Sequence, residues 1–464
     1  MLKDDPAAKI ERAIEGFLQW LDDYGFYSYD HFDFWGSRLG VFAKRAWHSP
    51  PIAADGKQSA RRAIKSFDQT FSKVWPPAGP LVLSLQVLES FFPRSRILFA
   101  KKKRFAIGDA HFAMGFSNLY QYYNDPDYKD RAEKILEEIR SNAIPTASGI
   151  GWGYPYTWVT GRAIYPPGTP FITITPYCFD AFLAVYDITG EKKYLDTAEQ
   201  ITRFAANDLN ETIISGTETA VSYSPIENSQ VINASAYRAA MLLKGFELFG
   251  AREYKEKAVK NINFVLNQQQ TDGSWYYAVN EHFIDNFHTC FVLKNLYKSY
   301  LILEDEKIFK AVKRGYDYYR GFLYRKDRTP IHFSKRGRHP QPIHGQPDVV
   351  LSGTSSQKFA EKIKFHKVLL KSINHKFRKI EMYDYAEGIA LGPLLNPDIE
   401  GALDFSLQLA LHLIDAFQLK KGYFVTRVTT LGTRNKVPYL RWPQAQLFYA
   451  LTSLLLTGSG REKI

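Results

Sequence analysis

The chain has 464 residues, a formal net charge of +12, and a composition that is 45% hydrophobic and 23% charged. This composition excludes wholesale disorder, and the length indicates either two domains or one large closed architecture. No apolar run reaches about 18 residues, and the segment Met1–Pro6 has acids where a signal peptide needs a basic start. Cys178 and Cys290 lie within apolar helical patterns, as free thiols do in a reducing compartment. We therefore expect a cytoplasmic protein without a transmembrane segment.

The positive charge and the aromatic residues narrow the possible partners. An excess of Lys and Arg favours a polyanion, which would be nucleic acid, an anionic membrane or an acidic polysaccharide. The sequence has no zinc-finger spacing, RNA-binding aromatic signature or helix-turn-helix pattern, so nucleic acid is disfavoured. Aromatic residues make up 15% of the chain. Many of the Tyr and Trp residues lie beside Gly, Pro and Asn, in loops where they either anchor packing or stack on sugar rings.

A degenerate repeat runs along most of the chain. In each copy an apolar helix precedes an amphipathic helix that opens with an aromatic residue and has an alanine about four residues later. Clear copies open at Tyr128, Tyr194 and Tyr254. The apolar helices are expected at about 111–123, 174–188, 230–249, 286–303, 381–395 and 442–457. Helices that are apolar all round belong inside, and helices with one polar face belong outside. The pattern predicts an all-α fold, an (α/α)6 toroid of the six-hairpin glycosidase type with short β-hairpins in its loops.

Two regions depart from the repeat. Residues 1–105 are expected to form an N-terminal extension packed on the toroid of residues 106–464, with a first helix near 7–20 beside the last inner helix. Residues 325–379 are polar and basic and are predicted to be a long insertion over the mouth or the flank. Its histidines lack metal-ligand spacing, so we expect them to be solvated: they are His332, His339, His344, His366 and His375.

In such a toroid the loops that lead into the inner helices gather at one mouth. Gly and Pro fix tight turns in these loops, and aromatic residues project from them. Loops of this length in a compact fold are usually functional. We predict that they form the walls of a substrate site, with Trp152, Tyr154, Tyr156, Trp275, Tyr276, Tyr439 and Trp442 as the aromatic members.

Tyr223 and Glu227 lie just before the third apolar helix. At a helix entrance the Tyr223 hydroxyl can point into the mouth, and Glu227 adds a carboxylate beside it. The alternative is a turn tyrosine that packs on Pro225, with Glu227 as an ordinary acid at a helix start.

His288 follows Asp285 at the entrance to the fourth apolar helix. A histidine beside a carboxylate can carry a proton near neutral pH. The alternative is a histidine that caps the helix or bonds to a backbone carbonyl. His282, in the same loop, is a weaker candidate.

Tyr383, Asp384 and Glu387 enter the fifth apolar helix, and we predict that Tyr383 and Glu387 contact the substrate. The spacing of three places both carboxylates on roughly one helical face. Glycoside hydrolysis needs two opposed carboxylates, so a second acid such as Glu227 or Asp285 would have to face them. Ordinary acids at a helix start are the simpler interpretation.

Arg427, Arg434 and Arg441 gather near the last apolar helix. Arginine binds carboxylates through two parallel hydrogen bonds, so this group is a candidate anchor for a uronic acid. Exposed arginines on a hairpin are the alternative for the first two. Arg441 lies between aromatic and apolar neighbours, which favours a binding role.

The sequence has no Walker loop, no GxGxxG after a strand, no Gly-x-Ser-x-Gly elbow, no HExxH and no CxxC. These absences disfavour nucleotide-dependent, serine-hydrolase and zinc-protease activities. We expect neither a cofactor nor a metal.

The run from Tyr223 through Asn233 to Tyr237 resembles the C-terminal domain of D-glucuronyl C5-epimerases, which are toroidal enzymes that invert uronic acids in heparan-type polysaccharides. Gly151-Trp152 resembles an earlier Gly-Gly-Trp element, and His288-Thr289 resembles the end of an Asp-Tyr-His-Thr motif. The resemblance covers about 150–300. It implies that Tyr223 is catalytic and that Asn233 belongs to the substrate site.

Two positions depart from the epimerase pattern. Ser222 stands where the family has Glu before its catalytic tyrosine, and Phe287 stands where it has a second tyrosine before the histidine. The second departure leaves one proton-transfer partner unassigned. The closing Pro438–Trp442 run also resembles toroidal proteins of bacterial and archaeal surface-polysaccharide gene sets.

The leading hypothesis is an enzyme that removes the C5 proton of a uronic acid in an acidic polysaccharide, leading to epimerisation or elimination. Tyr223 and His288 would exchange protons, and Arg441 would bind the carboxylate. The alternatives are a glycoside hydrolase that uses Glu227, Asp285, Asp384 or Glu387, and a non-catalytic glycan-binding or scaffold protein of polysaccharide biosynthesis.

Overall fold

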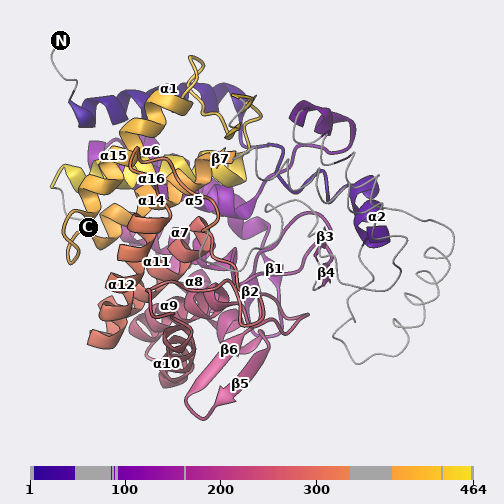
Figure 1. The fold of residues 1–464 in the computed structure, drawn as a ribbon, viewed down its shortest axis with the longest axis vertical. Coiled ribbons are helices and arrows are strands. Elements are labelled where there is room, and N and C mark those ends of the chain that lie inside the picture. Colours follow the sequence, from indigo (N-terminus) through magenta and orange to yellow (C-terminus); the bar gives the residue numbers. More distant parts are fainter. Residues whose placement is uncertain are drawn as a thin grey trace.

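The computed structural model describes residues 5–47, 85, 88, 92–160, 163–334, 379–429 and 432–460. Most of the predicted insertion, including four of its five histidines, lies outside the described residues. His332 lies within them. Figure 1 shows a helical molecule with a few short strands.

Among the described residues, six helices line the inside of the fold, and they are buried nearly all round. They are α5 (Ala106–Tyr123), α7 (Thr175–Thr189), α9 (Ile232–Phe249), α11 (Asn286–Leu303), α14 (Met382–Leu395) and α16 (Ala445–Gly458). Each packs on the next, and α16 packs on α5, so the ring closes. The apolar composition of these helices explains their position, because a helix without a polar face is stabilised by burial on all sides.

An outer ring of amphipathic helices covers the inner one. It comprises α1 (Pro6–Tyr24), α6 (Pro126–Ser141), α8 (Lys192–Asn207), α10 (Arg252–Asn267), α12 (Glu306–Phe322) and α15 (Ala402–Phe417). α1 packs against α15 and α16, so it occupies the place of the sixth outer helix (Figure 1). The two rings confirm the predicted (α/α)6 toroid.

Short hairpins fill the loops that precede the inner helices. The antiparallel pairs are β1 (Ile144–Pro145) with β2 (Ile150–Gly151), β3 (Trp158–Val159) with β4 (Ile164–Tyr165), and β5 (Glu211–Ser215) with β6 (Glu218–Val221). A three-stranded sheet contains, in spatial order, β7 (Lys379–Glu381), β8 (Arg427–Thr429) and β9 (Arg434–Asn435). Outside the toroid lie α2 (Arg38–Trp47) and the 3-10 helix η1 (Pro93–Leu98), and the π-helix η2 (Leu440–Gln444) leads into α16.

One backbone hydrogen bond recurs around the mouth. The carbonyl groups of Tyr223, Tyr277, His332 and Thr426 accept the backbone N–H of Ile172, Ile232, Asn286 and Met382, respectively. Ile232, Asn286 and Met382 are the first residues of α9, α11 and α14. Each loop is therefore bonded to the segment at the start of the preceding inner helix. The residue whose carbonyl accepts this bond occupies an equivalent place in each loop, on the rim of the mouth.

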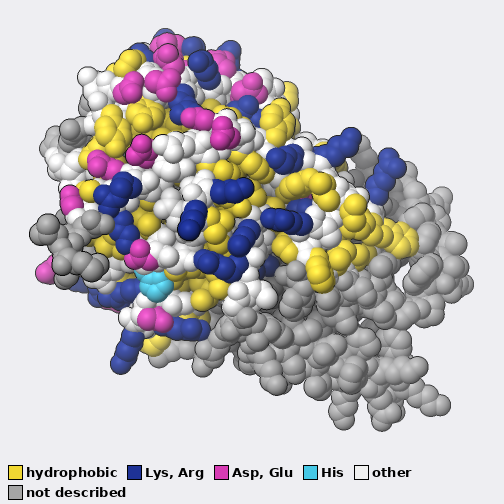
Figure 2. Space-filling model, turned by 90° about the horizontal axis from the view of Figure 1, so that it is seen from above, with side chains coloured by type: hydrophobic (Ala, Val, Ile, Leu, Met, Phe, Trp, Pro, Cys, Tyr) yellow, Lys and Arg dark blue, Asp and Glu magenta, His cyan; other side chains and the backbone are white. Residues whose placement is uncertain are grey.

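The mouth lies at the end where the inner helices begin. At the opposite end the inner helices pass to the outer ones through tight turns, and Asn124, Gly190, Gly250 and Glu304 adopt a left-handed backbone there. These turns are short, so they present few side chains at this end of the toroid. On the face that Figure 2 shows, Lys and Arg side chains are interspersed with apolar ones. No helix in the described part of the chain is long and apolar enough to cross a bilayer.

Candidate active site at the toroid mouth

His288 and Asp285 form a buried dyad at the start of α11. Asp285 caps this helix, because its Oδ1 accepts the backbone N–H of His288 at 2.8 Å. Its Oδ2 lies 2.6 Å from His288 Nδ1. A carboxylate can only accept, so Nδ1 of His288 donates to Asp285, and in the neutral tautomer Nε2 would have the lone pair. The sequence left open whether His288 caps a helix or carries a proton; in the structure Asp285 is the cap, and the proton-carrying role of His288 stays a prediction.

Tyr223 lies in the same cluster. Its hydroxyl donates to Oδ1 of Asn233 at 3.0 Å and lies 3.2 Å from the hydroxyl of Tyr277. The Tyr277 ring packs on the His288 ring, with 4.5 Å between centroids. The structure thus brings the Tyr223–Asn233 pair beside the Asp285–His288 pair, although the two pairs belong to different helix entrances. The Nδ2 atom of Asn233 is buried and has no hydrogen-bond partner among the described residues.

A second dyad, His332 with Asp384, lies near the first, and the Phe287 ring contacts both histidines. His332 Nδ1 is 2.9 Å from Oδ2 of Asp384, and its side chain is 9% exposed. The expectation that His332 is solvated was wrong, because the 325–334 segment folds back on the mouth and its Ser334 N–H bonds to the carbonyl of Ile284. Phe287 stacks on His332 at 5.6 Å and contacts His288 at 4.1 Å, between centroids.

The environment of the second dyad raises the pKa of both of its titrating groups, His332 and Asp384. Burial would lower the pKa of His332, but the carboxylate of Asp384 more than offsets this, so the pKa is raised above its usual value. Burial raises the pKa of Asp384 to about 6, against the opposing effect of His332. His332 is therefore suited to hold a proton near neutral pH. The Oδ1 atom of Asp384 has no hydrogen-bond partner in the described part of the chain.

The repeat contains a signal that would have located His332. Isolated bridges join Gln269 to Trp275, Tyr324 to Pro330, and Gln418 to Phe424, always six residues apart. The residues two positions after these bridges are Tyr277, His332 and Thr426. Their carbonyl groups accept the backbone hydrogen bond that recurs around the rim. Aligning the turns of successive repeats therefore places His332 on the rim beside Tyr277.

Aromatic rings connect the two dyads. Trp442 stacks on Tyr383 at 5.7 Å and lies 6.1 Å from Phe287, between centroids. Tyr383 also lies 5.2 Å from Phe287. Trp442 is partly exposed, and its Nε1 has no partner among the described residues. Trp442 therefore remains a candidate for contacts with a sugar, whereas Tyr383 is buried against the rings of Trp442 and Phe287.

Other predicted aromatic residues are packing anchors instead of open stacking faces. Trp152 and Trp275 are 1% and 2% exposed, and their Nε1–H groups donate to the carbonyls of Ile139 and Val265 in the outer helices. Tyr439 is fully buried. Their predicted role as stacking walls was wrong, because a ring held against an outer helix offers no face to a ligand.

Tyr154, Tyr156 and Tyr276 differ in their surroundings. Tyr154 and Tyr156 are buried and stack on each other at 5.5 Å, and the Tyr156 hydroxyl donates to Oδ1 of Asp30 at 2.7 Å. Tyr276 is partly exposed and packs on the ring of His282. Of the three, Tyr276 keeps a face that a ligand can reach.

Arg441 is already neutralised within the protein. Its guanidinium donates to both oxygens of Asp30, and the two side chains are 1% and 0% exposed. The structure does not favour the predicted role as a uronate anchor, because a substrate carboxylate would have to compete with a fully buried ion pair. The pair instead ties the segment after α1 to the entrance of α16. Arg427 likewise pairs with Glu381, at 2.5 Å.

The predicted acids Glu227 and Glu387 are engaged by protein groups. Glu227 accepts the backbone N–H groups of Tyr223, Ser224 and Ser229, which fixes the loop that presents Tyr223. Glu387 lies deeper, where it pairs with Lys294 at 2.6 Å and accepts from Gln446. Their predicted roles at the mouth, catalytic for Glu227 and substrate-binding for Glu387, are therefore replaced by loop fixation and by an internal ion pair.

No group of three or more His, Cys, Asp or Glu side chains in the described ranges has the arrangement of a metal site. The polar groups of the mouth are instead paired as imidazole with carboxylate and phenol with amide. Such pairs hold and move protons.

No protein-family model matches the chain, and no curated protein matches its sequence. Solved structures do match its fold. They include an unsaturated glucuronyl hydrolase specific for heparin, with 11% identity, a TM-score of 0.52, and coverage of 79% of this chain and 89% of that one. Cellobiose 2-epimerase from Bacillus thermoamylovorans has 10% identity, a TM-score of 0.54, and coverage of 76% and 88%. A D-mannose isomerase has 12% identity, a TM-score of 0.51, and coverage of 76% and 87%.

At such low identity these similarities establish the fold. The chain is an (α/α) toroid protein of the architecture that these sugar epimerases, isomerases and hydrolases share. Function has to be argued from the site.

Proposed function

We propose that the chain is a carbohydrate-active enzyme that removes the C5 proton of a uronic acid in an acidic polysaccharide and returns a proton to the opposite face. The observation that carries the proposal is the pair of dyads, His288–Asp285 and His332–Asp384, whose imidazole rings both contact Phe287. Inverting a carbon centre requires one group that takes a proton and a second that gives one. The fold shared with sugar-processing enzymes and the net charge of +12 support an acidic glycan as the substrate.

Each group has a role in the proposed reaction. The neutral His288 takes the C5 proton through Nε2, and Asp285 stabilises the imidazolium that forms. The electron pair of the C–H bond moves toward the substrate carboxyl group as an enolate. His332 then gives its proton to C5 from the other face. His332 thereby supplies the second proton-transfer group, which the epimerase pattern provides as a tyrosine at the position of Phe287.

Asn233 would bind the oxygen on which negative charge develops, through its Nδ2–H, which has no hydrogen-bond partner among the described residues. The Tyr223 hydroxyl donates to Oδ1 of this amide and lies against Tyr277, so it orients Asn233 before substrate arrives. Preorganised donors of this kind stabilise developing charge strongly. Arg441 takes no part in this chemistry.

The state of the carboxylates favours proton transfer at carbon over glycoside hydrolysis. A hydrolase needs two available carboxylates on opposite sides of the bond. Glu227, Asp285 and Glu387 each have both oxygens engaged by protein groups. Among these candidates only Asp384 keeps an oxygen without a partner in the described residues.

The proposal is tested by incubating the enzyme with uronic-acid polysaccharides in deuterium oxide, followed by proton NMR. We expect loss of the C5 proton signal, and a reduction of this rate by about 10²-fold in Tyr223→Phe, because the variant lacks the hydroxyl that orients the Asn233 amide. New reducing ends without C5 exchange would show a hydrolase. Saturable line broadening without a chemical change would show a binding protein.

The pH dependence reports on His332. Because Asp384 raises the pKa of His332, the proton donor persists above the usual histidine range and is lost as pH rises through the raised value. We expect Asp384→Asn to lower that pKa and so move the alkaline limb of the inversion rate to lower pH. A rate that drops equally at every pH in the variant would contradict the assignment. The measurement is the inversion rate of both proteins between about pH 5 and 10.

A further inference from the structure

A second chamber lies inside the inner ring and extends toward the end opposite the mouth. Its lining includes Lys298, Pro393 and Ser453, which belong to the C-terminal halves of α11, α14 and α16. None of Tyr223, His288 and His332 lines it. The chamber has a volume of about 70 Å³ and adjoins a slot of about 280 Å³ between α7, α9 and α11.

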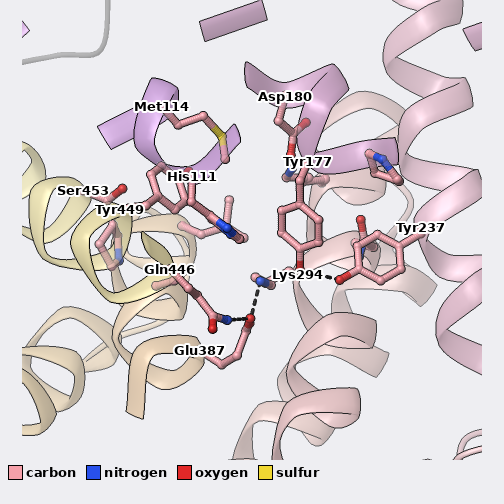
Figure 3. Close-up of a pocket in the computed structure, with 16 residues that line it drawn as sticks. His111, Met114, Tyr177, Asp180, Tyr237, Lys294, Glu387, Gln446, Tyr449 and Ser453 are labelled. Atoms are coloured by element: carbon pink, nitrogen blue, oxygen red, sulfur yellow. Dashed lines mark hydrogen bonds and ion pairs between the residues drawn. The ribbon is translucent and has the colours of Figure 1, made fainter. Parts of the chain in front are cut away.

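The lining of the chamber includes a polar cluster (Figure 3). Glu387 pairs with Lys294 and accepts from Gln446, and the hydroxyls of Tyr177 and Tyr237 lie 2.6 Å apart. Gln446 is 3% exposed, and its Oε1 lacks a hydrogen-bond partner among the described residues. A buried acceptor without a partner is costly, so a ligand that donates an O–H to it would be stabilised.

The charges of the chamber are balanced internally. Lys294 pairs with Glu387 at 2.6 Å, and Lys298 pairs with Asp180 at 2.5 Å. An anion or a cation would have to compete with one of these pairs, and disrupting the Lys294–Glu387 pair would leave a buried charge uncompensated. A neutral hydroxylated ligand can bond to the remaining lone pairs and N–H groups without breaking either pair.

The chamber and the slot also have apolar surfaces. His111 packs on Tyr177 at 4.8 Å and on Tyr449 at 5.8 Å, between ring centroids. Burial lowers the pKa of His111 to about 3, so its ring is neutral. The slot adds Phe179 and Met241. Aromatic and apolar faces beside hydrogen-bonding groups match a sugar ring, which has apolar C–H faces and a polar edge.

We infer that this chamber and slot form a separate binding site for a neutral monosaccharide, which enters from the end of the toroid opposite the mouth. The inference takes the carbohydrate class from the proposed function, but it depends on different residues. Ala390 lines the chamber, is partly exposed, and belongs to neither dyad. Ala390→Phe would fill the chamber without touching the mouth.

The test is isothermal titration of the full chain with D-glucose and D-mannose, beside D-glucuronate. We expect saturable binding of a neutral sugar that survives Tyr223→Phe, and binding at least about tenfold weaker in Ala390→Phe. Gln446→Met provides a second variant, since it removes the unpaired acceptor at similar volume, and it should also weaken binding. The folding of each variant is checked by thermal unfolding.

Three results would overturn the inference. One is the absence of binding to the wild-type protein, and another is equal binding by wild type, Ala390→Phe and Gln446→Met. The third is loss of binding in Tyr223→Phe alone, which would place the sugar in the mouth. A positive result remains interpretable if no polysaccharide is converted, because the titration needs no turnover.

Discussion

His288→Gln is expected to lower kcat by about 10²- to 10⁴-fold, the usual contribution of a positioned acid or base. Glutamine keeps polar atoms near Asp285 but cannot take a proton at neutral pH. Asp285→Asn should lower the rate in the same direction, because the carboxylate no longer holds the Nδ1–H tautomer or stabilises the imidazolium. The measurement is the initial rate of C5 exchange.

His282→Gln is the matched control for this prediction. His282 lies in the same loop but is exposed, and its ring bonds to the backbone carbonyl of Val279 instead of a carboxylate. We expect an unchanged rate. Equal loss in His282→Gln and His288→Gln would mean that the loop matters for its shape and not for the chemistry of His288.

Arg441→Met is expected to lower the free energy of unfolding by about 3–5 kcal/mol, because it leaves the buried Asp30 carboxylate without its partner. Asp30 is fully buried and also accepts from Tyr156, so it cannot turn to water. Chemical denaturation measures the change. The double variant Asp30→Asn with Arg441→Met should recover much of the loss, since no uncompensated charge remains.

Lys244→Ala gives the surface comparison. Lys244 and Glu247 form an exposed pair at 2.7 Å, which should contribute less than about 1 kcal/mol. If Arg441→Met were as mild as Lys244→Ala, Arg441 would not hold the fold together, and a ligand-binding role would regain support.

The toroid could be predicted because its signal is local and repeated. Helices such as α9 and α11 are apolar nearly all round, whereas α10 and α12 have one apolar stripe, and this contrast is visible in the sequence. The His288–Asp285 dyad could be predicted for the same reason, because both residues lie within one helix entrance.

The remaining features depend on contacts between distant parts of the chain. Arg441 resembles a free binding residue until Asp30, 411 positions away, is placed against it. Trp152 and Trp275 lie in glycine-containing loops, yet the closed ring presses them against outer helices. His332 was misjudged because the polar composition of the following residues concealed its place at the end of a repeat turn.

The most direct test of the two-dyad site compares C5 exchange with C5 inversion for wild type and His332→Gln in deuterium oxide. Proton NMR follows both the loss of the C5 proton and the configuration of the product. We predict that wild type yields inverted uronic acid with deuterium at C5, whereas His332→Gln exchanges the proton but inverts at least about tenfold more slowly. Reducing ends released by wild type without deuterium at C5 would contradict the proposed chemistry, and unimpaired inversion by His332→Gln would remove the second dyad from it.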